Sequence, residues 1–392
     1  MDHFHIIQAL CRSALSNPSK ATIHQIERLK AALEKDGKAK EAASIAGLLT
    51  EVNNTLDMSP SKIERSRMAM AGETITAKTM VPVDKESSTP LAEIIFPNEL
   101  PNDSPIFSEN VTIAIESILN EWRHFDELHA IAAQPSRSCL IYGAPGTGKT
   151  QLALWIAKQI GLPVVLARLD GMMSSFLGTT SRNIGNLFSF ASRYRCILLL
   201  DEFDAIAKLR NDTQEVGEIK RVVNTLLQHL DTRANIGFTI GVTNHESLLD
   251  PAIWRRFEVQ IEIPKPTPEV MYSILRKFLS PLELNDTQMK LFTWAIANGS
   301  GADAESLAKW LKKSSVLDLE YENNLVAKIR QFAMLNSGRV EKEKREMLIM
   351  DDEDLMVALS NEQSSDFKQK EIASLFNKTA STTSKIISKS KI

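Results

Sequence analysis

The N-terminal part of the chain carries apolar residues at helical spacing. They recur every three or four positions in three groups, and Asn17-Pro18 and Asp36-Gly37 separate the groups. We therefore expect a helical N-terminal domain over residues 1–56. Two roles suit such amphipathic helices: packing on the rest of the chain, or docking a substrate or partner.

The helical periodicity stops in the next stretch of the chain, residues 57–105. Prolines follow serine or threonine at Ser59-Pro60 and Thr89-Pro90, and Pro97 and Pro101 interrupt the chain again. Because proline and serine clusters disfavour regular elements, this composition predicts a flexible linker that is partly extended.

Short apolar runs alternate with helical patterns between residues 106 and 264. A helix is expected over 111–125, and the apolar runs lie at 140–142, 164–167, 197–200, 238–242 and 260–263. This alternation predicts an α/β fold in which a parallel sheet is flanked by helices.

After Pro264 the pattern is helical to the end of the chain. Thr267 is a suitable N-cap, because Pro268 follows it at the first helical position. Helices are expected at 269–279, 287–297, 304–316 and 321–334. We interpret residues 265–361 as a helical lid domain and residues 362–392 as a basic C-terminal tail.

Composition narrows the class of protein but does not decide it. The 392 residues are 43% hydrophobic and 24% charged, which suits several globular units. A net charge of −3 gives no overall preference for nucleic acid or membranes. The three cysteines and seven histidines form no metal-binding pattern, and no apolar run is long enough to span a membrane. We expect a cytoplasmic protein with reduced thiols and no membrane partner.

The stretch at residues 139–150 carries the clearest chemical signal. An apolar strand runs into a loop of the form G-x-x-x-x-G-K-[ST], and a helical pattern follows. Glycines let backbone N–H groups surround phosphate oxygens, Lys149 would reach the β- and γ-phosphates, and the Thr150 hydroxyl would bind Mg²⁺. The residues expected to bind ATP here are Gly143, Ala144, Pro145, Gly146, Thr147, Gly148, Lys149, Thr150 and Gln151.

A second signal follows the apolar run at 197–200. Asp201 and Glu202 come directly after it, at the carboxyl end of a predicted parallel strand, where ligands of α/β proteins bind. We expect Asp201 to hold Mg²⁺ with Thr150, and Glu202 to polarise the attacking water.

With these two motifs the chain resembles the AAA+ ATPases, and most closely the AAA clade of protein-remodelling and protease-associated enzymes. The resemblance covers residues 106–359 and implies an AAA+ module with a helical lid. It also implies that Asn244, after the run at 238–242, orients the water or contacts the γ-phosphate.

The same resemblance implies arginines that act on ATP bound by a neighbouring subunit. Arg255 and Arg256 occupy the matching segment, and they are adjacent here, whereas many relatives have Pro-Gly between the two. Either one can be the residue that acts in trans. The implied assembly is a homo-oligomeric ring, expected to be a hexamer.

Two further segments match the family pattern. Gly301 and Ala302 resemble the lid segment that packs near the adenine. Phe176, Leu177 and Gly178 resemble an aromatic-aliphatic-glycine loop that lines the central pore and grips unfolded polypeptide. The alternative for Phe176 and Leu177 is that they are core residues at the end of a helix.

No protease motif is present in the sequence: it lacks H-E-x-x-H and G-x-S-x-G. A protease that uses this ATPase would be a separate chain. The helical N-terminus and linker weakly resemble bacterial AAA ATPases that are encoded beside subtilisin-like proteases in phage-defence operons.

The C-terminal tail raises a different possibility. Residues 369–376 and 380–387 resemble the two helices of a helix-turn-helix, and residues 352–360 could form a supporting helix. Lysines dominate this tail, yet the second helix has no Arg, Asn or Gln to read base edges.

The leading interpretation is Mg²⁺-dependent ATP hydrolysis by a ring that remodels or threads a protein. The alternatives are a DNA-associated ATPase and an assembly switch set by nucleotide.

Overall fold

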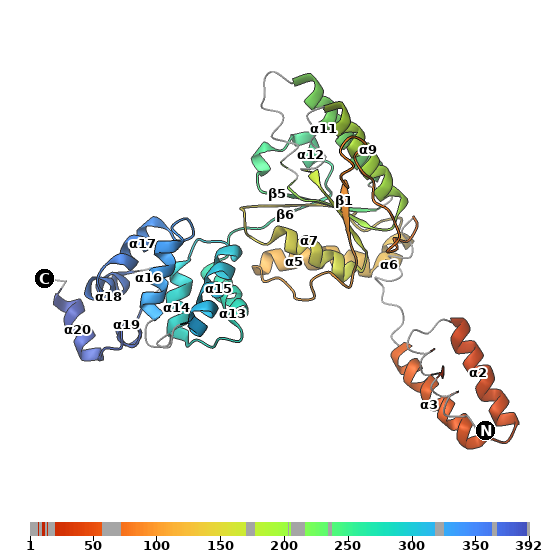
Figure 1. The fold of residues 1–392 in the computed structure, drawn as a ribbon, viewed down its shortest axis with the longest axis horizontal. Coiled ribbons are helices and arrows are strands. Elements are labelled where there is room, and N and C mark those ends of the chain that lie inside the picture. The colour runs from red at the N-terminus through yellow and green to blue at the C-terminus, as the bar shows by residue number, and fades with distance from the viewer. Residues whose placement is uncertain are drawn as a thin grey trace.

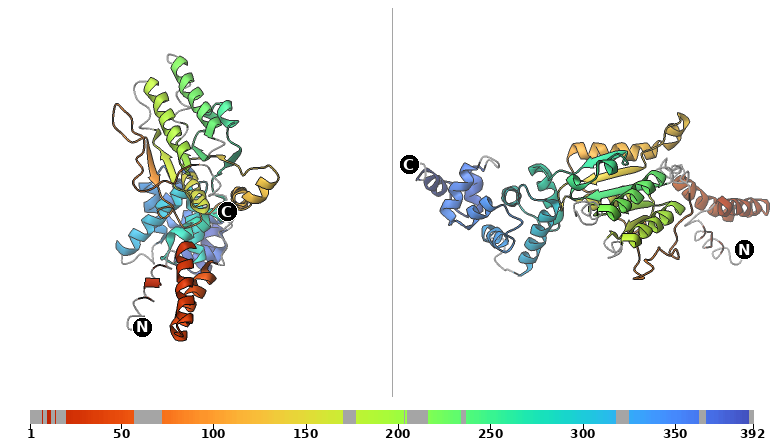
Figure 2. Two further views of the ribbon diagram at one scale, coloured as in Figure 1. Left: turned by 90° about the vertical axis from the view of Figure 1, so that its right-hand side faces the viewer. Right: turned by 90° about the horizontal axis from the view of Figure 1, so that it is seen from above.

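The computed structural model describes residues 20–56, 72–169, 177–202, 204, 216–233, 237–317, 325–362 and 367–389, together with positions 7, 10, 11 and 14. In two perpendicular views, the α/β domain lies between a helical pair at the N-terminal side and a helical region at the C-terminal side (Figures 1 and 2).

The centre of the molecule is a six-stranded sheet with the order β1-β3-β4-β5-β2-β6. Its strands are β1 (Ala92–Ile95), β2 (Ser138–Tyr142), β3 (Val164–Ala167), β4 (Ile197–Leu200), β5 (Phe238–Thr243) and β6 (Val259–Glu262). The strands predicted from apolar runs are confirmed, and β2 to β6 pair in parallel. Their interiors are buried because helices cover both faces.

The helices of this domain form two layers. They are α5 (Glu109–Arg123), α6 (Phe125–Ala130), α7 (Lys149–Ile160), α9 (Leu177–Arg193), α11 (Val216–Arg233), the 3₁₀ turn η2 (Glu246–Leu248) and α12 (Pro251–Trp254). One core cluster joins α5 and α7 to one face of the sheet, and a second joins α9 and α11 to the other. Figure 1 shows these two pairs on opposite sides of the strands.

The expected parallel sheet has one antiparallel strand at its edge, where β1 pairs with β3. The same strand shows that part of the stretch expected to be a flexible linker, residues 57–105, is folded. Leu91 and Ala92 are buried against the sheet, and the main chain of Arg168 donates to the carbonyl of Leu91 at 3.0 Å. The described part of that stretch, 72–105, therefore belongs to the α/β domain.

The lid helices follow the sheet directly. They are α13 (Pro268–Leu279), α14 (Asp286–Ala295), α15 (Gly301–Leu317) and α16 (Leu325–Leu335), as the helical pattern predicted. Thr267 caps α13 as expected: its hydroxyl accepts from the main-chain N–H of Val270 at 3.5 Å, and Pro268 opens the helix.

The remaining helices lie at the two ends of the chain. They are α2 (Lys20–Lys35) and α3 (Ala39–Leu56), and then α17 (Lys342–Ile349), α18 (Asp352–Asn361), α19 (Gln369–Leu375) and α20 (Ala380–Lys389). Ile26, Leu33 and Ile45 are buried between α2 and α3. The C-terminal helices share one apolar core with the lid, because Ile372 and Ile387 belong to the same buried cluster as Leu275.

Within the described residues, none of the helices has the length and apolar character that crossing a lipid bilayer requires.

Candidate functional site

The loop between β2 and α7 has the geometry of an anion-binding turn. Gly143 has φ 138°, and a Cβ there would lie 2.2 Å from the carbonyl oxygen of Ile263, so only glycine fits beside β6. Gly148, with φ 92°, is the N-cap of α7. The loop thus ends at a helix N-terminus, where free N–H groups and the helix dipole favour negative charge.

Lys149 lies at the first position of α7 and is only 4% exposed. Its ammonium donates to the carbonyl oxygens of Gly143 at 2.9 Å and Ala144 at 2.7 Å. Burial lowers the pKa of Lys149, and the charges of Asp201, Asp204 and Glu246 oppose that effect. A buried ammonium among carboxylates is positioned to bind a phosphate group.

Thr150 and Asp201, the two residues predicted to hold Mg²⁺, lie together. The Thr150 hydroxyl donates to Oδ2 of Asp201 at 3.0 Å, although the two residues are 51 positions apart. One hydroxyl and one carboxylate fit a magnesium ion that takes its other ligands from phosphate and water. Among the described residues, no group of three or more His, Cys, Asp or Glu side chains could hold a metal ion with protein ligands alone.

Glu202 follows Asp201 in an unusual backbone conformation. Its φ is 51°, in the left-handed region that side chains other than glycine rarely adopt, and its N–H donates to Oδ1 of Asp201 at 3.0 Å. Strain of this kind concentrates at functional sites. The Glu202 side chain is exposed and borders the same cavity as Asp201.

Asn244 follows β5, the strand beside β4, and it also borders the cavity. Its neighbours form a polar group that sequence reasoning missed. Thr243 donates to Oδ1 of the buried Asp204 at 3.2 Å, and Nε2 of His245 lies 4.0 Å from the other carboxylate oxygen. This group fixes the end of β5 against the segment after Glu202.

A cavity of about 800 Å³ lies between the α/β domain and the lid. The predicted residues that border it are Pro145, Gly146, Thr147, Gly148, Lys149, Thr150, Gln151, Asp201, Glu202, Asn244, Gly301 and Ala302. Gly143 and Ala144 do not border it, and their carbonyl groups accept from the ammonium of Lys149. Volumes of this size are typical of ligand pockets.

The lid contacts the phosphate-binding loop through its backbone. The N–H of Ala302 donates to the carbonyl of Gly146 at 3.1 Å. Ser300 precedes α15, and both its N–H and its hydroxyl donate to Oδ2 of Asp303 at 2.8 Å. The start of α15 therefore lies on the loop.

The apolar wall of the cavity was not predicted. It consists of Ile106, Phe107, Ile274 and Phe278, with the stem of Lys277 on the same helix. Ile274 and Phe278 are four positions apart on α13, so the helical pattern at 269–279 already placed them on one face of the helix. An apolar wall facing a polar floor suits a nucleotide, with the base on one side and the phosphates on the other.

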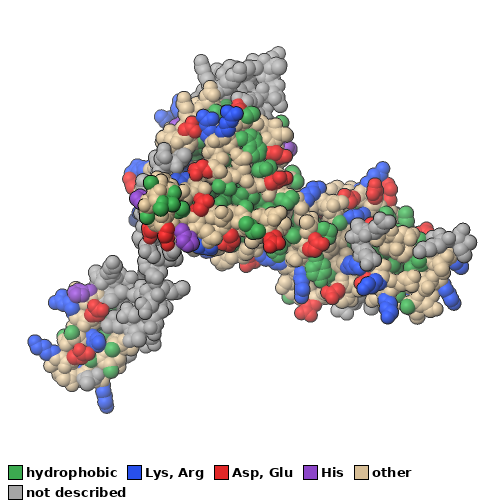
Figure 3. Space-filling view, turned by 180° about the vertical axis from the view of Figure 1, so that it is seen from behind, with side chains coloured by type: hydrophobic (Ala, Val, Ile, Leu, Met, Phe, Trp, Pro, Cys, Tyr) green, Lys and Arg blue, Asp and Glu red, His purple; other side chains and the backbone are tan. Residues whose placement is uncertain are grey.

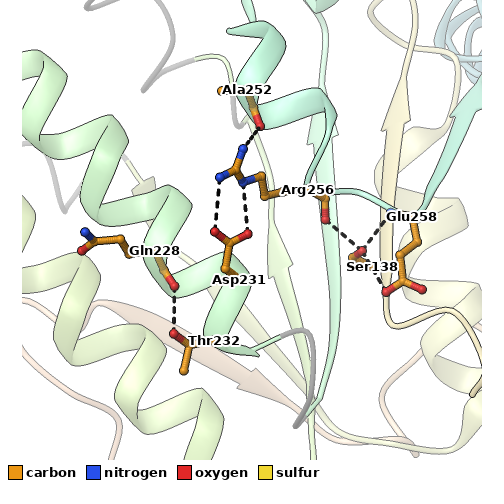
Figure 4. A network of polar contacts seen from close by, with 7 residues as sticks. All are labelled: Ser138, Gln228, Asp231, Thr232, Ala252, Arg256 and Glu258. Carbon is orange, nitrogen blue, oxygen red and sulfur yellow. Dashed lines mark hydrogen bonds and ion pairs between the residues drawn. The ribbon is translucent and has the colours of Figure 1, made fainter.

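The adjacent arginines differ in their surroundings. Arg256 is held by Asp231 of α11, with Nε at 3.0 Å from Oδ1 and Nη2 at 3.3 Å from Oδ2, and it also donates to the carbonyl of Ala252 at 3.2 Å (Figure 4). The hydroxyl of Ser138, at the start of β2, donates to the Arg256 carbonyl at 3.1 Å. Arg255 is exposed, and its side chain has no hydrogen bond or ion pair to the described residues.

Neither arginine borders the cavity of its own chain. The structure therefore does not bring Arg255 or Arg256 together with Lys149 in one subunit.

Two of the three residues proposed for a pore loop lie at the start of α9. Leu177 and Gly178 are the first two residues of this helix, and Phe176 lies outside the described residues.

Comparison with known proteins gives the family. The family model of the ATPase family associated with various cellular activities (AAA) matches residues 139–265. An uncharacterized AAA family ATPase of Sinorhizobium fredii, y4kL, is 32% identical over 267 residues, which are 68% of this chain and 78% of that protein. The chain is an AAA family ATPase.

A second relative and a solved structure are also similar to this chain. The proteasome-activating nucleotidase of Pyrococcus furiosus is 28% identical over 253 residues, which are 62% of this chain and 63% of that protein. Among solved structures, the FIGL-1 AAA domain in complex with ADP has a TM-score of 0.52 at 20% identity, covering 69% of this chain and 96% of that chain. The structural likeness supports the fold of the AAA ATPase, and membership of the family implies ATP binding and hydrolysis.

Proposed function

We propose that this AAA ATPase works as a homo-oligomeric ring, expected to be a hexamer, with ATP sites shared between neighbouring subunits. One observation carries the proposal: among the described residues that border the cavity there is no arginine, whereas Arg255 is exposed and without a partner in the described residues. Phosphoryl transfer gains much of its rate from an arginine that neutralises developing charge. A neighbouring copy can supply it.

The two arginines then have different roles in the proposal. Arg256 fixes the short helix α12 to α11 through its two contacts with Asp231. Arg255, one position earlier, is left to reach the ATP of the next subunit. Of the two adjacent arginines, we therefore propose Arg255 as the residue that acts in trans.

Within one subunit, the proposed chemistry follows the geometry of the cavity. Lys149 binds the β- and γ-phosphates, and Thr150 and Asp201 hold Mg²⁺, which would neutralise phosphate charge. Glu202 accepts a proton from the water that attacks the γ-phosphorus, and Asn244 orients that water. The bond to the β-γ bridging oxygen breaks, and ADP and inorganic phosphate leave.

The work that we propose for this hydrolysis is the remodelling or threading of a protein. The support is the position of Leu177 and Gly178 at the start of α9 and the similarity to a proteasome-activating nucleotidase. We further propose a separate protease as the partner, because the sequence has no protease motif of its own. We also propose a role in anti-phage defence, which is supported by the sequence resemblance alone.

The catalytic assignment is tested with Glu202→Gln. This variant should bind ATP with normal affinity, and its kcat should fall by at least about 100-fold because the proton acceptor is lost. Glu93→Gln is the matched control, since Glu93 is exposed on β1 and borders no part of the cavity. Normal turnover in Glu202→Gln would refute the assignment. The same variant, as a substrate trap, should capture the partner protein.

The shared site is tested by mixing two inactive variants. Arg255→Ala keeps an intact phosphate-binding loop, and Lys149→Ala keeps an intact Arg255. Each alone should have little activity, and the mixture should regain part of it, because some interfaces then combine both intact halves. A mixture no more active than its components would refute the trans role. Arg256→Ala should lower Tm, whereas Arg255→Ala should leave Tm unchanged.

Threading is tested with Phe176→Ala and denatured casein as a generic unfolded polypeptide. The variant should keep its basal ATP turnover and lose the stimulation that casein gives. Equal stimulation in wild type and variant would exclude a role for Phe176 in gripping polypeptide.

A second candidate function is supported by the C-terminal helices. Helices α18, α19 and α20 pack against one another, and Asn377, with φ 52°, lies in the short turn before α20. The lysines of residues 367–389 are Lys368, Lys370, Lys378, Lys385 and Lys389, against one acid, Glu371. Helix α20 contains no Asp or Glu, and Lys and Arg side chains project from this end of the molecule (Figure 3). We propose contact with DNA phosphates as the alternative function.

This candidate predicts salt-dependent binding to a short labelled DNA duplex. Replacing Lys385 and Lys389 together by Glu should abolish the binding, because two phosphate contacts become repulsive. Lys342→Glu is the control, since Lys342 is an exposed lysine of the lid. Binding that is absent in the wild type, or equal in all three proteins, would exclude the DNA role.

A further inference from the structure

The segment of residues 72–91, which we call the strap, contacts both ends of α9. At the C-terminal end, the N–H of Glu73 donates to the carbonyl of Arg193 at 2.9 Å, and the N–H of Arg195 donates to the carbonyl of Glu73 at 2.8 Å. A Cβ at Gly72 would lie 2.9 Å from the same Arg193 oxygen, so this close approach needs glycine. The Glu73 carboxylate adds an ion pair with Nε of Arg193 at 3.1 Å.

At the N-terminal end of α9, a different residue of the strap makes the contact. Oε1 of Glu86 accepts from the hydroxyl of Thr179 at 3.0 Å and lies 3.4 Å from Nη2 of Arg182. Thr179 is buried, although it lies in the first turn of the helix. A carboxylate at a helix N-terminus also interacts favourably with the helix dipole. The first turn of α9 is thus held by one side chain of the strap.

Glu86 is itself fixed in place by a tight turn. Val83 and Pro90 form an antiparallel bridge, and between them the carboxylate of Asp84 accepts from the N–H of Glu86 at 3.2 Å and the hydroxyl of Ser87 at 2.9 Å. The N–H of Glu86, followed by the Ser87 hydroxyl, lowers the pKa of Asp84. Asp84 is buried, and the two hydrogen bonds that its carboxylate accepts fix the conformation of the turn that carries Glu86.

Between its two ends, the strap is part of the hydrophobic core. Ile75 and Leu91 are buried in the same cluster as Ile184, Leu187 and Phe188 of α9. The covalent path from α3 to the α/β domain also enters through the strap. A displacement of the strap would therefore move α9, and a displacement of the N-terminal helices would reach the strap first.

We propose that the strap sets the position of the first turn of α9, which begins at Leu177, and that Glu86 is the positioning residue. The inference rests on the proposed threading function, because that function gives the start of α9 its task. Glu86 contacts α9 two and five residues after Leu177, so it holds the first turns of the helix that carries Leu177 and Gly178. It contacts no part of the nucleotide cavity.

The inference is tested by hydrogen exchange in the full-length chain. Glu86→Ala should speed amide exchange in residues 179–187 by about 5-fold, since two partly exposed contacts are lost. Glu86→Gln should restore most of the protection, because its amide oxygen still accepts from Thr179. Glu93→Ala is the matched control: Glu93 forms an equally exposed ion pair with Arg168, at 2.9 Å, away from α9. Equal exchange in Glu86→Ala and Glu93→Ala would overturn the inference.

A second readout separates positioning from a loss of stability. Glu86→Ala should keep the basal kcat and KM for ATP within about twofold of wild type, and casein stimulation should fall at least 3-fold. Glu86→Gln should recover most of the stimulation, because its amide oxygen still accepts from the Thr179 hydroxyl. Lost basal activity in Glu86→Ala, or no recovery in Glu86→Gln, would contradict a positioning role.

The two proposals fail in different ways. If Phe176→Ala keeps casein stimulation, the threading function fails, and the exchange data still decide whether Glu86 holds α9. If the exchange data show no effect of Glu86, the strap inference fails and threading is unaffected.

Discussion

The β2–α7 loop and the first turn of α9 are held by two different segments of the chain, the lid and the strap. At the β2–α7 junction, the lid donates a main-chain hydrogen bond from Ala302 to Gly146. At the start of α9, the strap supplies the Glu86 carboxylate. In the sequence, the lid follows the strands of the sheet, whereas the strap precedes them. Different segments therefore contact the nucleotide site and the start of α9.

The two supports also differ in chemistry. The phosphate-binding loop depends on backbone conformations that only glycine adopts and on contacts between main-chain atoms. The start of α9 depends on side chains at a half-exposed position. The first kind of support tolerates almost no substitution, whereas the second can be adjusted one residue at a time. Two substitutions and one pH titration test this difference, in decreasing order of the effect that we expect.

The largest effect is expected from Gly143→Ala. The added Cβ meets a backbone carbonyl at 2.2 Å in a strained conformation, so β2 and β6 must separate. We expect a loss of about 3 kcal/mol in the free energy of unfolding and no binding of a fluorescent ATP analogue. Gly338→Ala is the control, because no atom lies within 4 Å of its new methyl group. Normal binding by Gly143→Ala would contradict a backbone-limited junction.

The next effect is the pH dependence of nucleotide affinity. Burial lowers the pKa of Lys149 below its ordinary value of 10.5, so the free protein loses this proton at a lower pH than an exposed lysine would. Because phosphate binding uses the ammonium, affinity should fall as pH rises through that pKa, approaching tenfold per pH unit. Titrating the Kd of the analogue from about pH 7 to 10 measures it. Lys149→Arg should give a flat curve, and an equally flat wild-type curve would contradict the prediction.

The smallest effect is expected at the strap. The pKa of Asp84 is lowered from its ordinary value of 3.8, so its contribution to stability is present above that value and is lost as pH falls through the lower, folded pKa. Asp84→Asn should slightly lower Tm at neutral pH and leave Tm unchanged in acid below both pKa values. The comparison of Tm at the two pH values checks this. A Tm difference that persists in strong acid would mean that the turn depends on packing and not on charge.

The parts of the fold that sequence reasoning recovered are those with strong local patterns. The interior strands are continuous apolar runs, and the spacing around Lys149 has few alternatives. Strand β1 escaped notice because it is four residues long, half-exposed and preceded by Thr89-Pro90. Its place at the sheet edge follows from pairing with β3, which no local pattern encodes.

The residues of the candidate site also divide into those that a local sequence pattern predicts and those that depend on tertiary contacts. Asp201 could be predicted because it ends an apolar strand. The different surroundings of Arg255 and Arg256 could not, since they depend on Asp231, which lies 25 residues away from Arg256 on another helix. The contact of Glu86 with Thr179 spans 93 residues and follows from tertiary packing alone.

The edge strand has a practical consequence for shortening this protein. A chain cut at Ile106, where the α/β pattern begins in the sequence, would lack β1 and leave the backbone groups of β3 unpaired along a hydrophobic edge. Such an edge can recruit a strand from another molecule, so that fragment should precipitate on expression. A cut before Gly72 would retain the edge strand and both attachments of α9, and the resulting fragment should stay dispersed.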